Sequence, residues 1–220
     1  MRITLARSLV LIAFLLAPLS TLGQTGKVEP LGALTDSAVP DAIRQVVMEK
    51  GYRIFDGANA LAEIWFRKEI PTQPKTAGSD AVYDGIAESA LVGVVHFVKS
   101  TNDYRDQSVA AGFYTLRYAL MPNDGNHLGV APSRDFLLLV PVNADPGPQA
   151  SPKFLELVAL SRKAAGTKHP APLSLVPAES AAAPGISQNE EGHTIFTSKV
   201  HLSSGEDISL ALVVKGTAPQ

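Results

Sequence analysis

The sequence predicts a mainly β fold, namely a single antiparallel β-sandwich-like domain with two short α-helices. Three observations lead to this prediction. Short runs of alternating or continuous apolar residues, rich in valine, isoleucine and aromatic side chains, recur along the chain. Turn-forming residues separate these runs. Helical spacing of apolar residues occurs in two short stretches, and there is no internal repeat that would indicate a second domain.

The first 23 residues have the layout of a secretory signal peptide. Arg2 and Arg7 form a positive start, and residues 9–16 are an unbroken apolar run too short to span a bilayer. Small residues follow, so cleavage is expected after Gly23. The alternative is an uncleaved N-terminal anchor. Cleavage would give a secreted or periplasmic protein without a membrane span.

Beyond the signal peptide we expect a lead-in and one domain. Residues 24–38 are polar, small and unperiodic, which indicates a flexible lead-in, and residues 39–217 form the predicted β-sandwich domain. A first short helix is expected after Pro40, which suits the first helical turn, and Gly51 ends it. A second helix is expected at 153–166, where apolar residues recur at helical spacing up to a glycine; they are Phe154, Leu157 and Val158.

The strands are expected where apolar and β-branched residues cluster between turn formers. Turns of Asp, Asn, Gly and Ser predict hairpins at 56–59, 110–112 and 203–206. The run at 90–98 is almost continuously apolar, which favours a strand buried on both faces. The predicted strands are 52–55, 60–66, 90–98, 103–109, 112–121, 134–142, 193–202 and 207–216.

The direction of each side chain follows from the two-residue period of a strand. On 112–121 this leaves Thr115 and Arg117 on the other side from the core, exposed or under a partner. Glu63 and Trp65 likewise share a face, compatible with a surface pair. Apolar mass usually lies inside, so most aromatic residues are expected in the core rather than on a stacking platform for sugars or peptides. The predicted core rows are Tyr114, Leu116, Tyr118, Leu120 and Ile208, Leu210, Leu212, Val214.

Composition and motifs exclude several classes of function. The chain has no cysteine, hence no disulfide, thiolate metal site or thiol nucleophile. Its formal net charge of −2 gives no basic footprint for nucleic acid. It lacks a GxSxG nucleophile elbow, a glycine-rich phosphate loop and a dinucleotide fingerprint. We therefore predict no catalytic residues and no cofactor.

The strongest candidate for a binding surface is the loop at 122–133. Long loops in compact β domains often carry function. Asp124, Asn126 and His127 are expected to contact a ligand, while Arg134 and Asp135 hold the base of the loop. Asn, Asp and Gly are also turn formers, so this segment is first of all the bend of a long hairpin.

The alternative is a metal site or a hydrolase at the same loop. His127 and Asp124 could approach one centre, and a strand histidine such as His96 would have to complete the ligand set. No short motif ties these histidines together, and the loop lacks the acidic ladder of a calcium site.

Three segments resemble a set of uncharacterised exported bacterial proteins, a domain of unknown function. They are GYRIFDGANALAEIWFRK, LVGVVHFVKSTNDYRDQ and GFYTLRYALMPNDGNHLGVAPSRDFLLLVP, and the resemblance extends from about Gly51 to Leu175. The phrase AAGFYTLRY is also similar to a hairpin motif of a small β-domain family. The resemblance implies an exported protein and carries over no activity or catalytic residue.

Together these observations predict an exported, non-enzymatic β-sandwich protein. Its role would be that of a ligand-binding or structural module of the cell envelope, with a small molecule, a glycan or a protein as its ligand. A metal-binding protein or hydrolase that uses His127, Asp124 and a strand histidine is the alternative.

Overall fold

The chain folds around one long, curled β-sheet. The structure is a computed structural model that describes residues 26–122, 131–178 and 183–218. Its elements, in chain order, are β1 (Gly26–Leu31), α1 (Asp41–Arg44), β2 (Gly51–Asp56), β3 (Asn59–Phe66), β4 (Leu91–Phe97), β5 (Thr101–Asn102), β6 (Ser108–Val109), β7 (Gly112–Leu120), β8 (Asp135–Pro141), α2 (Phe154–Ala165), β9 (Pro172–Val176), β10 (Gly185–Gln188), β11 (Thr194–His201) and β12 (Asp207–Lys215).

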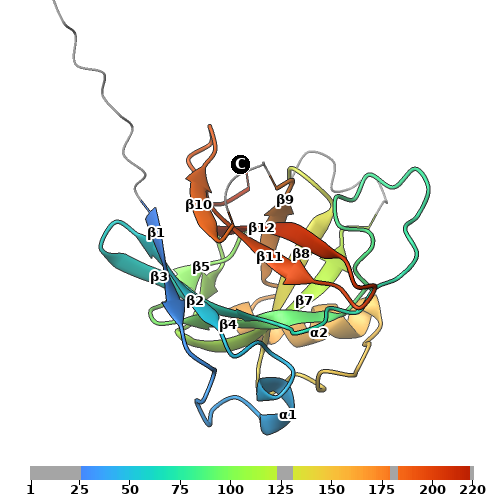
Figure 1. Cartoon of the computed structure of the whole chain (residues 1–220), viewed down its shortest axis with the longest axis horizontal. Coiled ribbons are helices and arrows are strands. Elements are labelled where there is room, and N and C mark those ends of the chain that lie inside the picture. Colours follow the sequence, from blue (N-terminus) through green and yellow to red (C-terminus); the bar gives the residue numbers. More distant parts are fainter. Residues whose placement is uncertain (1–25, 123–130, 179–182, 219–220) are drawn as a thin grey trace, which may run out of the picture.

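Ten of these strands form a single antiparallel sheet in the order β1-β2-β3-β4-β7-β8-β9-β12-β11-β10. The sheet curls until its edge strands β1 and β10 lie side by side (Figure 1). At this seam a Cβ atom on Gly26 would lie 2.8 Å from Cγ2 of Ile186, so a glycine is needed there. The predicted mainly β, antiparallel domain with two helices is confirmed. The two layers expected of a sandwich are opposite walls of one nearly closed sheet.

The segment predicted as a flexible lead-in, residues 24–38, contributes a strand instead. β1 pairs with β2 along its whole length. It lacks an alternating apolar pattern because backbone hydrogen bonds define it, and Pro30 is tolerated on an edge strand. The described part of the domain therefore begins at residue 26 rather than at 39.

Of the four predicted hairpins three are confirmed and one is wrong; the long hairpin across the 122–133 loop is confirmed by the pairing of β7 with β8. β2 and β3 form a hairpin at the predicted turn, and so do β11 and β12. The hairpin expected at 110–112 does not form, because β7 pairs with β4 and β8 while β5 and β6 pair with each other. A strand of nine residues finds partners of matching length in β4 and β8, which the two-residue β6 does not offer.

The two helices differ in how well the sequence predicts them. α2 ends as expected, with Gly166 in the left-handed conformation at a φ of 65°. At its start, the carboxylate of Glu156 accepts a hydrogen bond from the backbone N–H of Lys153. α1 is only four residues long. The chain after it turns to the sheet, where the N–H of Met48 donates to the carbonyl of Phe66 at 2.8 Å.

Side chains fill the interior of the curled sheet. The inward rows of β7 and β12 belong to this core, as the two-residue period predicts. Phe66 and Phe196 stack in it with their ring centroids 6.2 Å apart. Because the interior is packed, the outer face and the ends of the sheet are the places for a binding site.

Residues 34–47, including α1, cover the outer face of β3 and β4. Trp65 packs beneath this cover, and its indole N–H donates to the carbonyl of Gly32 at 2.9 Å. Only 5% of Trp65 is exposed, so the predicted surface pair with Glu63 is wrong. The pleat sets the direction of the side chain, but a distant segment decides whether solvent reaches it.

Two further covers lie over the other half of the sheet. α2 packs on β7 and β8 through Leu157 and Val158 (Figure 1). The β5–β6 hairpin lies at the start of β9, where the N–H of Tyr104 donates to the carbonyl of Pro172 at 2.8 Å. The N–H of Ala218 in turn donates to the carbonyl of Tyr104, also at 2.8 Å, which brings the C-terminal residues onto the hairpin.

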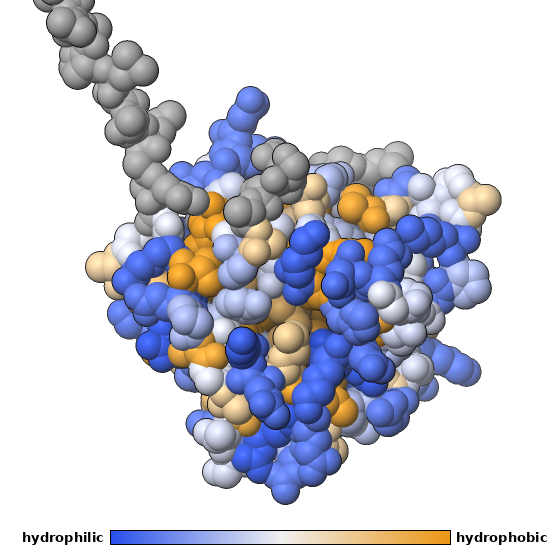
Figure 2. Space-filling model, viewed as in Figure 1, coloured by the Kyte–Doolittle hydropathy of each residue, from blue (hydrophilic) through white to orange (hydrophobic). Residues whose placement is uncertain are grey.

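The face seen in Figure 2 is mainly hydrophilic, and its apolar residues form separate patches between charged and polar ones. Of the large apolar residues in the described ranges, four are clearly exposed: Val82, Val98, Phe154 and Leu155. Two of the four are neighbours at the start of α2. No helix within the described residues has the length and apolar character needed to cross a membrane.

Candidate functional site

The predicted ligand contacts in the 122–133 loop are not part of the described structure. Asp124, Asn126 and His127 lie in the segment 123–130, outside the described residues. Their roles as ligand or metal contacts stay predictions. Arg134 and Asp135, which follow the loop, are described.

Arg134 closes the base of the loop. Its Nε and Nη2 both donate to the carbonyl of Met121, at 2.9 and 2.7 Å, and the N–H of Met121 donates back to the carbonyl of Arg134. Its third nitrogen donates to Asp80 at 2.8 Å, which lowers the pKa of that carboxyl. The guanidinium is engaged within the protein, so Arg134 acts as a clamp.

Asp135 anchors a different loop. Its carboxylate is fully buried and accepts hydrogen bonds from the N–H of Val82 at 2.7 Å and of Tyr83 at 2.8 Å. The hydroxyl of Tyr118 donates to it at 2.7 Å, and burial together with this bond raises the pKa of Tyr118. Asp135 therefore holds the 71–88 segment over one end of the barrel, the name used here for the nearly closed sheet. Its carboxylate has no oxygen that faces solvent.

His96, the strand histidine of the metal alternative, is held on the outer face of β4. Its Nδ1 lies 2.8 Å from Oε2 of Glu63, and its ring stacks on Phe113 with centroids 4.1 Å apart. The other oxygen of Glu63 accepts a hydrogen bond from Nε of Arg53 at 2.8 Å. Burial opposes the charge on Glu63, but these bonds outweigh it and lower its pKa.

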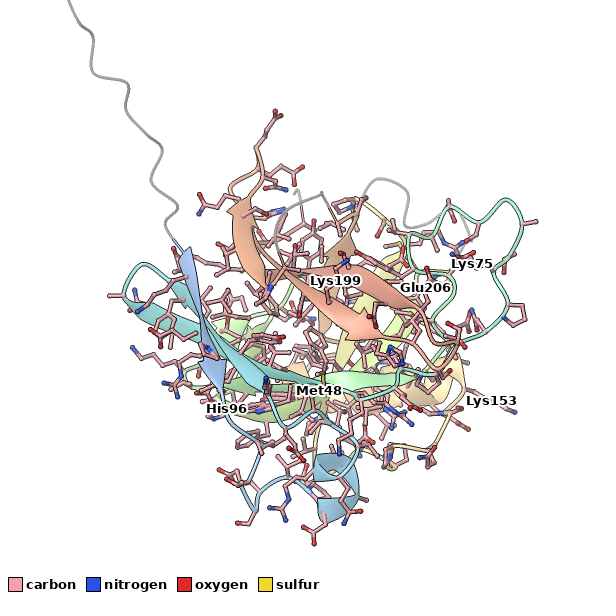
Figure 3. The ribbon with its side chains drawn as sticks, in the orientation of Figure 1. Met48, Lys75, His96, Lys153, Lys199 and Glu206 are labelled. Carbon is pink, nitrogen blue, oxygen red and sulfur yellow. The ribbon has the colours of Figure 1, made fainter. Side chains whose placement is uncertain are left out.

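The position of His96 separates it from the base of the 122–133 loop. His96 pairs with Phe113 near the start of β7, whereas the loop leaves β7 after Leu120. Seven residues of strand correspond to about 23 Å. Within the described ranges, no three His, Asp or Glu side chains come together as a set of metal ligands. Figure 3 shows His96 on the side of the molecule away from Lys153, where α2 begins.

A groove on the outer face is the best-defined candidate site among the described residues. It lies where the cover of α2 ends and that of the β5–β6 hairpin begins, and its volume is about 250 Å³. Its lining is predominantly apolar, and among the described residues that line it the ionisable side chains are Arg105, His169 and the phenol of Tyr104. Ala119, Phe136, Leu138 and Pro172 form the floor, and Met121, Phe154, Val158 and Tyr104 contribute to the walls.

The floor exists because outward-facing positions of three adjacent strands are apolar. Ala119 of β7 lies opposite Phe136 of β8, and Leu138 lies opposite Pro172 of β9. The small side chain of Ala119 gives the groove depth between its larger neighbours. α2 begins beside this floor rather than over it, so the first turn of the helix forms a wall.

Tyr104 brings a polar group to the edge of this apolar site. Only 2% of the residue is exposed, and its hydroxyl has no hydrogen bond of normal geometry within the described residues. Burial raises the pKa of Tyr104, and the charge of Glu191 adds to this, while the nearby side chain of Ser174 opposes it. Buried hydroxyl groups normally have a partner, and the side chain of Ser174 is the nearby group that can serve as one.

A second hollow lies at the end of the barrel, between the 71–88 segment and β12. Its volume is about 340 Å³, and Lys75, Tyr83 and Glu206 are among its lining residues. Figure 3 shows Lys75 and Glu206 on the same side of the molecule. Lys75 and Glu206 bring charges of opposite sign to its lining, whereas the groove has an apolar floor.

No pattern in the sequence predicts the groove directly. The helical spacing predicts Phe154 in the buried stripe of α2, yet 37% of it is exposed, while Leu157 and Val158 are buried as expected. The available signal was the pair Phe154–Leu155, two large apolar neighbours that cannot both face the sheet from one helix. Comparison with family models, curated proteins and solved structures found no match. The resemblance to exported bacterial proteins therefore stays a prediction.

Proposed function

We propose that this protein is an exported, non-enzymatic binding module, and that the outer-face groove holds a small apolar ligand. The observation that carries the proposal is the groove itself: an open, concave surface with an apolar floor on three strands. Binding sites for small molecules are typically concave and mostly apolar, with a few polar groups that orient the ligand. Tyr104, Arg105 and His169 are those polar groups here.

The size of the groove limits the ligand. Sites for drug-sized molecules usually enclose about 300–1,000 Å³. At about 250 Å³ the groove lies just below this range, so a single alkyl chain or one ring fits better than a large ligand. The site is also rigidly framed, because its floor is strand and its walls are a helix and a hairpin hydrogen-bonded to β9.

A homologous series of neutral alcohols tests the proposal. Binding of hexanol, heptanol and octanol to the purified protein is measured by calorimetry. Burial of one methylene contributes about 0.8 kcal/mol, so each added carbon should tighten binding about fourfold until the groove is full. No binding, or an affinity independent of chain length, would contradict an apolar site.

Two neighbouring residues provide a matched pair of variants. Phe154 lines the groove and Leu155 does not, although both are exposed at the start of α2. Phe154→Ser should weaken octanol binding several-fold because a wall is lost, whereas Leu155→Ser should leave it unchanged. Equal losses in both variants would indicate a loose surface interaction rather than binding in the groove.

A further inference from the structure

Arg105 at the rim of the groove has an uncommitted charge. It lies in the turn between β5 and β6, where its backbone N–H donates to Asp103 at 2.8 Å. Its guanidinium forms no hydrogen bond or ion pair within the described residues. Most other arginines of the described ranges do bond through their guanidinium groups; these are Arg44, Arg53, Arg67, Arg117 and Arg134. Arg162, on the exposed side of α2, is the other exception.

His169, in the segment between α2 and β9, also lines the groove. Its backbone N–H donates to Oγ1 of Thr167 at 3.0 Å, and its ring forms no hydrogen bond within the described part of the chain. Thr167 also donates to Gln107 of the hairpin, and Nε2 of Gln107 donates to the carbonyl of Pro170 at 2.8 Å. These bonds fix the backbones that carry Arg105 and His169 relative to each other.

The acidic groups near this rim are already engaged. Asp103 is fully buried, and its carboxylate accepts hydrogen bonds from the backbone N–H groups of Arg105 and Gln107 and from the side chain of Gln107. Asp106 accepts a hydrogen bond from Asn102 at 2.6 Å. Within the described residues the rim therefore presents donors and positive charge: Asp103 interacts with Arg105 through its charge, but no carboxylate there is hydrogen-bonded to the guanidinium.

We propose that the ligand of this groove is a single-chain amphiphile with an anionic head, such as a medium-chain fatty carboxylate. The chain would lie on Ala119, Phe136 and Leu138, and the head would accept hydrogen bonds from Arg105 and His169. This inference rests on the proposed function. An apolar floor beside an unpaired guanidinium matches both parts of such a molecule, and arginine suits bidentate binding of a carboxylate.

The test compares octanoate with octanol at neutral pH. The two share their chain length and differ in the head group. Hydrogen bonds to charged groups contribute about 1.5–3 kcal/mol, so octanoate should bind the native protein at least tenfold more tightly than octanol. Arg105→Gln should remove most of this advantage, so that the affinity for octanoate falls far more than the affinity for octanol. His169→Gln should weaken octanoate binding by a smaller factor.

Arg162→Gln is the matched control, because it removes an equally uncommitted arginine that does not line the groove. It should leave both affinities unchanged. If octanol binds as tightly as octanoate, or if the two arginine variants lose octanoate equally, the anionic head is refuted while the apolar site stands. If neither compound binds, the proposed function itself fails.

Discussion

The outer face of β7 contains two positions that are only two residues apart and have different surroundings, although Arg117 is 0% and Ala119 only 5% exposed. Arg117 lies under the 143–150 segment and is fully buried, whereas Ala119 lies in the floor of the open groove. Both side chains point away from the barrel core, and the sequence predicts the same direction for both. The difference comes from what covers them.

The region around Arg117 is closed and fully hydrogen-bonded. Its Nε and Nη2 donate to the two oxygens of Asp145 at 2.9 and 2.7 Å. Its Nη1 also donates to the carbonyls of Ser89 and Ala150, both at 2.8 Å, and its Nη2 donates to the carbonyl of Gly147 at 2.6 Å. The sequence predicts that Arg117 is exposed or covered by a partner. The segment that covers it belongs to the same chain and consists of residues 143–150.

The comparison shows why one region is sealed and the other is open. A charge taken out of water must have every hydrogen bond replaced, so the segment that covers Arg117 has to fit closely. An apolar surface such as that around Ala119 loses only its contact with water when a ligand covers it. It can therefore remain open without an unsatisfied group.

Removal of Asp145 should have the largest effect on stability. Asp145→Ala would leave the buried guanidinium of Arg117 without its counter-charge, and loss of one partner of a buried pair costs about 3–5 kcal/mol. Urea denaturation measures this. Asp80→Ala, which removes the exposed partner of Arg134, is the control and should shift the midpoint far less. Similar shifts in the two variants would show that Arg117 is not sealed as described.

Asp135→Asn tests the second sealed carboxylate. The amide nitrogen of asparagine would face a backbone N–H of Val82 or Tyr83, so one buried donor loses its acceptor. A loss of about 1–3 kcal/mol of unfolding free energy is expected. Hydrogen exchange should also become faster at Val82 and Tyr83. Unchanged exchange at these amides would contradict the role of Asp135 as an anchor of the 71–88 segment.

Valine substituted at two different positions of β7 tests the difference between the sealed region and the open one. Thr115→Val removes a hydroxyl that donates to Asp145 at 2.6 Å, so it should cost about 1–2 kcal/mol. Ala119→Val adds two methyl groups to the groove floor, where a β-branched residue suits the strand, so stability should change by less than about 1 kcal/mol. Octanol binding should fall only in Ala119→Val. A larger loss of stability in Ala119→Val than in Thr115→Val, or weaker octanol binding in Thr115→Val alone, would contradict the difference between the two regions.

Glu63 should give the smallest effect, visible in the dependence of stability on pH. Its pKa is lowered in the folded protein, so the unfolded chain binds the proton more readily. Its stabilising contribution is therefore complete above its ordinary pKa of 4.5 and is lost as the pH falls below that value. Thermal unfolding of Glu63→Gln should lose less stability on acidification than the native protein. Parallel curves for the two would contradict the bonds from His96 and Arg53.

Much of the strand pattern could be predicted because it depends on neighbouring residues. The inward row of β12 follows from alternation, and the burial of β4 follows from its unbroken apolar run. β1 could not be predicted, since it is defined by hydrogen bonds to β2 rather than by its own side chains. For the site, Arg134 bonds to Met121 beside the 122–133 loop, while the ligand contacts predicted in that loop stay predictions; the groove lined by Phe154 and Tyr104 was not predicted.

The sequence by itself determined most of the longer strands, namely β2, β3, β4, β7, β8, β11 and β12, the rows of β7 and β12 that face the core, and where α2 ends at Gly166. These features follow from side-chain alternation and backbone preferences within a few residues. Only the tertiary structure decided that Arg117 is sealed, that Asp135 anchors a distant loop and that Ala119 remains in an open groove. Each of these depends on segments tens of residues away, such as 71–88, 143–150 and the β5–β6 hairpin. Their positions are set by packing and hydrogen bonds across the whole fold.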